Sequence, residues 1–355
     1  MFRRAAFVLV LSVPTLAAAG CDGGGSPTSD AASVDAAAVD TSVPGADGGP
    51  AIDGSRLDAS GPLDAALPVD AATSVDAATP VDAFAGVDGG GSACGTARPA
   101  LDATSGTEGL VIARDGTIYY SVRGGVARLA PDGTLDEAWL RVATGATIWG
   151  LALDASQTHL FIAHASGGEV RVATGLSGTP TSTRLAVVAQ PNGVTVGPDG
   201  FVYVSDFAGD AVLAIDPTTG ASTTVTTSDI AGADGVAFTD DGHLLVTSYS
   251  NGNVVSLALD AARHETSRTI VATSVPSADG VAVDENGVLY VGGGSRVYRI
   301  GTSGTPDTTL QMGQPGTANL EWGAGALDCH DLYVATGGGL TRIALDVGQR
   351  AVPWH

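Results

Sequence analysis

Residues 192–206 read Asn-Gly-Val-Thr-Val-Gly-Pro-Asp-Gly-Phe-Val-Tyr-Val-Ser-Asp, and this stretch contains a complete β-hairpin. Apolar residues alternate on both sides of the Pro-Asp-Gly turn, which is the pattern of two half-buried strands joined by a tight reversal. The segment Ala211-Val-Leu-Ala-Ile215 predicts a third strand, and residues 223–227 predict a fourth. Four short strands in about 40 residues are typical of one small antiparallel sheet.

The same phrase returns six times, with a leading residue, a glycine and alternating apolar residues in each copy. The leading residues are Glu108, Trp149, Asn192, Asp234, Asp279 and Trp322. Their intervals of 41, 43, 42, 45 and 43 residues match the length of a four-stranded propeller blade. The sequence therefore predicts an all-β fold, a six-bladed β-propeller of four-stranded blades, over residues 94–355. A two-sheet sandwich, the alternative, gives no reason for a 43-residue period.

The first 20 residues have the features of an export signal. Met1-Phe-Arg-Arg is basic, and the apolar run from Ala5 to Ala19 is too short to span a bilayer. The end of this segment, Leu16-Ala-Ala-Ala-Gly-Cys21, resembles a bacterial lipoprotein signal. That resemblance implies lipidation of Cys21 and a protein anchored in the cell envelope, in the periplasm or on the cell surface. The alternative is an ordinary cleaved signal with an incidental cysteine.

Residues 21–93 are expected to form a disordered tether. This segment consists largely of Ala, Asp, Gly, Ser, Pro, Val and Thr, and Phe84 is its only aromatic residue. So few large apolar side chains do not offset the entropy lost on ordering. Residues 22–93 contain 12 Asp and one Arg, so half of the net charge of −22 lies there.

The acidic balance excludes nucleic acid as a partner, because binding a phosphate backbone needs clustered Lys and Arg. We expect a monomer that contacts the membrane only through its lipid anchor. A small-molecule substrate or ligand is expected in the channel of the propeller.

Two cysteines remain besides Cys21. Cys94 precedes the first predicted blade and Cys329 lies in the sixth, and these two blades adjoin when the ring closes. In the oxidising compartment outside the cytoplasm, an even pair at these positions predicts a disulfide. Two buried free thiols are the alternative.

The six leading residues open the innermost strands, so we expect them to converge near the channel axis. Three of them, Glu108, Asp234 and Asp279, are acidic. Crowded carboxylates repel one another unless a cation neutralises them, and hard oxygen ligands favour calcium or magnesium, with manganese or zinc possible. The sequence thus predicts a divalent metal, with calcium preferred. A water-filled polar channel is the alternative.

These phrases resemble the gluconolactonase and regucalcin (senescence marker protein) superfamily of six-bladed propellers. That family has Glu-Gly in blade one, Asn-Gly in blades three and four, and Asp-Gly in blade five. Glu108-Gly109, Asn192-Gly193 and Asp279-Gly280 match on blades one, three and five. Residues 322–336, from Trp-Gly-Ala-Gly to Tyr-Val-Ala-Thr, also look like that family's last blade. The resemblance covers residues 106–346.

The resemblance implies a metal-dependent hydrolase of lactones or similar esters. Glu108, Asp234 and Asp279 become the metal ligands, Asn192 a substrate contact, and Asp279 also the group that takes a proton from water. Trp149 and Trp322 would shape the substrate pocket, or else serve as packing.

Two departures from the family pattern affect these assignments. Asp234 replaces the blade-four Asn, and Gln190 stands where an Arg often precedes the blade-three Asn. A family sugar-acid pocket is therefore not implied, and the register could slip by one blade between blades three and four. The phrases around Asn192 fit NHL repeats equally well, so a non-catalytic binding propeller displayed from the envelope is the second hypothesis.

Overall fold

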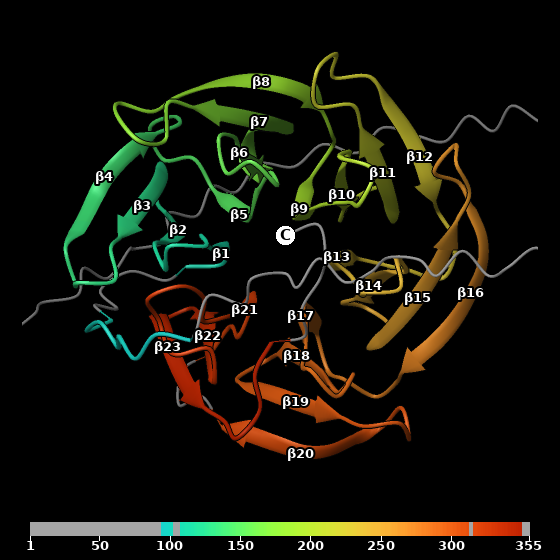
Figure 1. The fold of residues 1–355 in the computed structure, drawn as a ribbon. Coiled ribbons are helices and arrows are strands. Elements are labelled where there is room, and N and C mark those ends of the chain that lie inside the picture. The colour runs from blue at the N-terminus through green and yellow to red at the C-terminus, as the bar shows by residue number, and fades with distance from the viewer. Residues whose placement is uncertain (1–93, 102–106, 312–314, 350–355) are drawn as a thin grey trace, which may run out of the picture. The chain divides into compact units, whose positions relative to one another are not determined.

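The computed structural model describes residues 94–101, 107–311 and 315–349, and these residues form the blades of a β-propeller (Figure 1). The predicted signal peptide, Cys21 and the predicted tether lie outside the described residues. In the described part, no helix has both the length and the apolar character needed to cross a membrane. Its one short 3-10 helix is η1 (Ala165–Gly167).

Five sheets have four strands each, in the order of the chain. The first consists of β1 (Leu110–Ile112), β2 (Ile118–Val122), β3 (Gly125–Leu129) and β4 (Leu135–Arg141). The second consists of β5 (Ile148–Leu153), β6 (Leu160–His164), β7 (Glu169–Thr174) and β8 (Thr181–Val187). The third consists of β9 (Pro191–Val196), β10 (Val202–Asp206), β11 (Ala211–Ile215) and β12 (Ser222–Thr226).

The remaining blades complete the ring. The fourth sheet consists of β13 (Ala233–Phe238), β14 (Leu244–Ser248), β15 (Asn253–Leu259) and β16 (Glu265–Ala272). The fifth consists of β17 (Ala278–Val283), β18 (Leu289–Gly293), β19 (Arg296–Ile300) and β20 (Pro306–Gln311). The sixth has three strands among the described residues, β21 (Leu320–Trp322), β22 (Asp331–Thr336) and β23 (Gly339–Ala344). The six-bladed architecture is confirmed; four strands in every blade are found only for blades one to five.

Tight Asp-Gly and Asn-Gly turns join the first two strands of several blades. Gly200 adopts a φ of +79° in the blade-three turn, a conformation that side chains rarely adopt. The Asp199 carboxylate accepts the backbone N–H of Phe201 at 3.1 Å, which fixes the same turn. Each turn reverses the chain, so the second strand runs antiparallel to the first in a fixed register.

The core is divided among the spaces between adjacent blades. Six clusters of buried apolar side chains each join two neighbouring sheets, including one between blades six and one. Val204 and Val246, on the second strands of blades three and four, are fully buried in this way. Because apolar burial is the main stabilising term, each blade depends on both of its neighbours.

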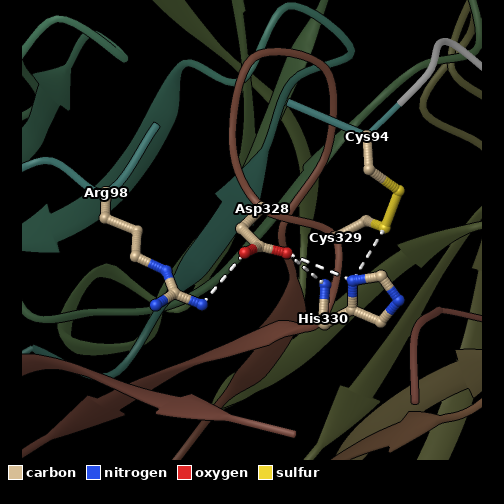
Figure 2. The surroundings of a disulfide bond; sticks show 5 residues. All are labelled: Cys94, Arg98, Asp328, Cys329 and His330. Carbon is tan, nitrogen blue, oxygen red and sulfur yellow. Dashed lines mark hydrogen bonds and ion pairs between the residues drawn. A yellow bond between two sulfur atoms is a disulfide. The ribbon is translucent and has the colours of Figure 1, made fainter. Parts of the chain in front are cut away.

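Covalent and ionic contacts close the ring (Figure 2). Cys94 and Cys329 form a disulfide with a Cα–Cα distance of 5.3 Å. Arg98 contacts Asp328 at 2.9 Å and the fully buried carboxylate of Asp331 at 2.8 Å. Ala97 also pairs with Leu327 through an isolated parallel bridge. The segment that precedes blade one is thereby fastened to blade six.

Candidate metal and substrate site

In blades one to five, the glycine of the repeat lies in close contact with the innermost strand of the next blade. A Cβ on Gly150 would lie 2.1 Å from the carbonyl oxygen of Asn192, and one on Gly193 would lie 2.3 Å from that of Asp234. Only glycine permits backbone contacts this close. The leading residue of one blade therefore packs directly against the glycine of the blade before it, which arranges the leading residues around the axis.

Ala318, and not Trp322, is the sixth member of this ring, and Asn319 takes the place of the repeat glycine. A Cβ on Gly280 would lie 2.8 Å from the carbonyl oxygen of Ala318 and 2.6 Å from the Cα of Asn319. Asn319 Nδ2 donates a 3.2 Å hydrogen bond to the carbonyl of Leu110, across the closure. The prediction that missed Ala318 followed the Trp-Gly letters, which stand four residues later.

Trp322 is a packing residue, the second of the two roles considered for it, and it does not line the channel cavity. Its side chain is 2% exposed, and Nε1 donates to the carbonyl of Val283 at 3.0 Å. In blades two, four and five, the pairing of the first two strands shifts register near the repeat glycine. Blade six pairs Leu320 with Val334 and Trp322 with Leu332 without such a shift. Leu320 is the first paired residue of blade six, as Leu110 is of blade one, so Asn319 stands at the glycine position and Ala318 at the leading position.

Hydroxyl groups on three second strands hold the bulges in place. Ser121 Oγ accepts the backbone N–H groups of Glu108 at 3.1 Å and Gly109 at 3.0 Å. Thr247 Oγ1 accepts the N–H of Gly235 at 2.7 Å. Ser205 Oγ accepts the N–H of Gly193 at 2.8 Å and donates to the carbonyl of Asp234 in the next blade. The backbone around the acidic residues is thus fixed before any ligand arrives.

A cavity of about 710 Å³ opens above this ring. The predicted residues that line it are Glu108, Trp149, Asn192, Asp234 and Asp279. The structure therefore places five of the six predicted metal or substrate residues in one cavity. Its volume lies within the range of small-molecule sites.

The acidic residues of the cavity strongly perturb one another. Burial, and then the charge of Asp279, raise the pKa of Glu108 to about 8. Burial raises the pKa of Asp279 to about 7. Burial also raises the pKa of Asp234 well above its usual range, and the charges of Asp279 and Glu108 raise it further. Each carboxylate is thus costly to ionise without a compensating cation.

The buried carboxylate of Asp234 indicates that a donor or a cation binds there. Its side chain is 2% exposed, and its Oδ1 atom has no hydrogen-bond partner among the described residues. A buried carboxylate oxygen needs a donor or a cation, because leaving it unpaired costs free energy. Carboxylate oxygens from three blades are the hard ligands that a calcium or magnesium ion prefers. In charge and ligand type, the residues present fit a divalent cation.

The spacing of the three carboxylates is wider than that of a closed metal cage. Among the described residues, the only group of three potential ligand atoms within 4.8 Å of one another is Asp328, Cys329 and His330. Cys329 is in the disulfide, so that group offers no thiolate. In the channel, an ion shared by Glu108, Asp234 and Asp279 would require a change in side-chain position or a bridging water.

Two aromatic residues of the cavity were not predicted from the sequence. Phe207 and Tyr249 line it together with Trp149. The ring centroids lie 6.1 Å apart for Trp149 and Phe207, and 5.7 Å apart for Phe207 and Tyr249. Phe207 and Tyr249 follow β10 and β14, two residues after the hydroxyl side chains of Ser205 and Thr247. The repeat period could have found them, because Arg123 lines the cavity from the corresponding position of blade one.

Comparison with known proteins identifies the family. Residues 150–338 match the family model described as SMP-30/Gluconolactonase/LRE-like region, and the chain therefore belongs to this family. The match covers blades two to five and most of blade six. No curated protein matches the chain significantly.

Solved structures share the propeller fold at low sequence identity. A gluconolactonase from Xanthomonas campestris is 20% identical with a TM-score of 0.56, over 69% of this chain and 87% of that one. A calcium-binding regucalcin from Agrobacterium tumefaciens is 16% identical with a TM-score of 0.59, over 74% and 98%. A luciferin-regenerating enzyme is 17% identical with a TM-score of 0.57, over 71% and 95%. At these identities the likeness establishes the fold.

Proposed function

We propose that the protein is a divalent-metal-dependent hydrolase of lactones or esters, with calcium as the preferred ion. The observation that carries this proposal is the unpaired Oδ1 atom of buried Asp234, beside the carboxylates of Glu108 and Asp279. Membership of the SMP-30/gluconolactonase family supports the reaction class, and the relative described as a calcium-binding regucalcin supports the ion.

Glu108, Asp234 and Asp279 would hold the ion. When bound, a divalent cation supplies the positive charge that polarises a lactone or ester carbonyl. Asp279 lies at the floor of the cavity and would accept a proton from the attacking water. The Asn192 side chain is 5% exposed and lines the same cavity, so its amide would donate to an oxygen of the substrate. Fixed bulges keep these groups at their positions, which lowers the cost of binding.

The test is hydrolysis of a panel of lactones and esters by the purified chain. We expect activity with calcium, loss of activity with a chelator, and recovery when calcium is restored. Asp279→Asn should lower kcat by about 100-fold or more, which is typical for loss of a general base. Asp328→Asn, an acidic position at the ring closure outside the cavity, is the matched control. Calcium binding without hydrolysis of any substrate would instead favour the non-catalytic binding propeller.

We also propose that the protein is anchored in the bacterial cell envelope through Cys21. The disulfide between Cys94 and Cys329 agrees with an oxidising compartment outside the cytoplasm. Metabolic labelling with a radioactive fatty acid should label the wild-type chain. Cys21→Ser should abolish the label and release the protein from membranes, and label retained in this variant would refute the anchor.

A further inference from the structure

Aromatic side chains line one side of the cavity, and the lining residues of the opposite side include no aromatic ring. Trp149, Phe207 and Tyr249 come from blades two, three and four. On the side of blades five and six the cavity is lined by Ala318, Gly316 and Gly337. The cavity is therefore lined by aromatic side chains on one side and by backbone and a methyl group on the other.

Hydrogen bonds fix the backbone that carries the aromatic wall. The backbone N–H of Phe207 donates to the carbonyl of Gln190 at 2.9 Å. The backbone N–H of Tyr249 donates to the carbonyl of Gly232 at 2.9 Å. Gly232 has a φ of +62°, and a Cβ there would lie 3.4 Å from the Phe207 ring and 3.3 Å from the Cβ of Tyr249. The backbone of Gly232 thus packs behind both side chains. A wall built in advance binds a ring with little loss of conformational entropy.

Several polar side chains of the cavity already have other roles, because Glu108, Asp234 and Asp279 are the proposed metal ligands. The hydroxyls of Thr107 and Ser121 lie 3.1 Å apart, and that of Ser121 also accepts two backbone N–H groups. Gln190, which stands where the family often has Arg, does not line the cavity. The remaining polar groups of the lining are the side chains of Asn192 and of the exposed Arg123 and Thr147, with the polar atoms of Trp149 and Tyr249. A polyhydroxylated ligand needs many placed donors and acceptors, whereas a flat apolar ring needs mainly aromatic surface.

We infer that the cavity selects a neutral lactone or ester that carries an aromatic ring, which stacks against Phe207 and Tyr249 while its carbonyl lies over the acidic floor. The reaction rests on the proposed hydrolase function; the ring subsite rests only on the aromatic wall. A neutral substrate also avoids repulsion from Glu108, Asp234 and Asp279.

The experiment separates these two claims with two measurements. The first compares kcat and KM for dihydrocoumarin, an aromatic lactone, with those for glucono-δ-lactone in calcium. The second measures calorimetric binding of 3-(2-hydroxyphenyl)propionamide, a non-hydrolysed aromatic amide, to the full chain in the presence of a chelator. Phe207→Leu and Tyr249→Leu test the wall, and Phe201→Leu is the matched control. Phe201 and Phe207 flank the two ends of the same strand, β10, and only Phe207 lines the cavity.

We expect a higher kcat/KM for dihydrocoumarin than for glucono-δ-lactone. Phe207→Leu and Tyr249→Leu should each raise the KM for dihydrocoumarin about 5- to 10-fold, which corresponds to the loss of one aromatic contact, and should weaken amide binding to the same extent. Phe201→Leu should change neither. Amide binding that depends on Phe207 in a chain without hydrolytic activity would support the ring subsite while the hydrolase function fails. A preference for glucono-δ-lactone, or equal effects of Phe201→Leu and Phe207→Leu, would overturn the inference.

Discussion

The side-chain amide of Asn319 donates a 3.2 Å hydrogen bond to the main-chain carbonyl of Leu110, and this bond joins the last innermost strand to the first. The same side chain accepts the N–H of Leu320 at 3.0 Å. Asn319 thus closes the ring of leading residues by a polar contact, where blades one to five use a glycine.

Asn319→Leu should therefore destabilise the propeller. It removes two hydrogen bonds near the axis and leaves the Leu110 carbonyl without this donor, at a cost of about 1–3 kcal/mol. For a domain of this size we expect the melting temperature to fall by roughly 2–4 °C per kcal/mol. Thermal unfolding checks this, with Asn286→Ala in an exposed turn as the control. Equal melting temperatures for the two variants would show that the contact does not contribute to closure.

Gly193→Ala should be among the most damaging single methyl additions in the chain. The new Cβ would lie 2.3 Å from the carbonyl oxygen of Asp234, so two innermost strands would have to separate. Overpacking of this kind costs about 3 kcal/mol or more. Gly178→Ala is the control, because its Cβ meets nothing closer than 3.9 Å. Denaturant unfolding should separate the two variants clearly, and similar midpoints would contradict the close approach.

Stability of the calcium-free chain should fall as the pH rises from about 5 to about 8. The pKa of Glu108 is raised to about 8 and that of Asp279 to about 7, mainly by burial, so the folded chain binds more protons than the unfolded chain in this window. Stability decreases with pH wherever the unfolded state binds fewer protons. Saturating calcium should flatten this dependence. Melting temperatures across the window measure it, and a rise with pH in the calcium-free chain would be the wrong sign.

Reduction of the disulfide should weaken the whole propeller. Cys94 and Cys329 are separated by 235 residues, and a cross-link over so long a loop contributes about 3–5 kcal/mol on the chain-entropy model. The double variant Cys94→Ser, Cys329→Ser should melt several degrees below the parent, and a reducing agent should have no further effect on it. A parent chain that melts at the same temperature with and without reductant would contradict this role.

The repeat made the fold predictable from the sequence. The glycine after the leading residue indicates a close contact between the innermost strands of two neighbouring blades, and that contact recurs in blades one to five. For the same reason Glu108, Asp234 and Asp279 could be assigned to one cavity from the repeat alone. In the sixth blade Asn319 replaces the repeat glycine, so no sequence pattern marks Ala318 as the leading residue.

Phe207 and Tyr249 of the aromatic wall were not predicted for a different reason. Phe207 and Tyr249 lie in loops after their strands, where packing imposes no fixed residue type, and the corresponding position of blade one is Arg123. Only the period, combined with a knowledge of which loops face the cavity, could have grouped them.

Calorimetric titration of calcium into the chelator-treated chain tests the central claim most directly. It compares the wild type with Asp234→Ala and with Asp328→Ala, which alters the group of Asp328, Cys329 and His330 at the ring closure. We predict one calcium per chain in the wild type and in Asp328→Ala, and at least a 100-fold loss of affinity in Asp234→Ala. Absence of calcium binding in the wild type, or loss of binding in Asp328→Ala with retention in Asp234→Ala, would contradict a metal centre in the channel.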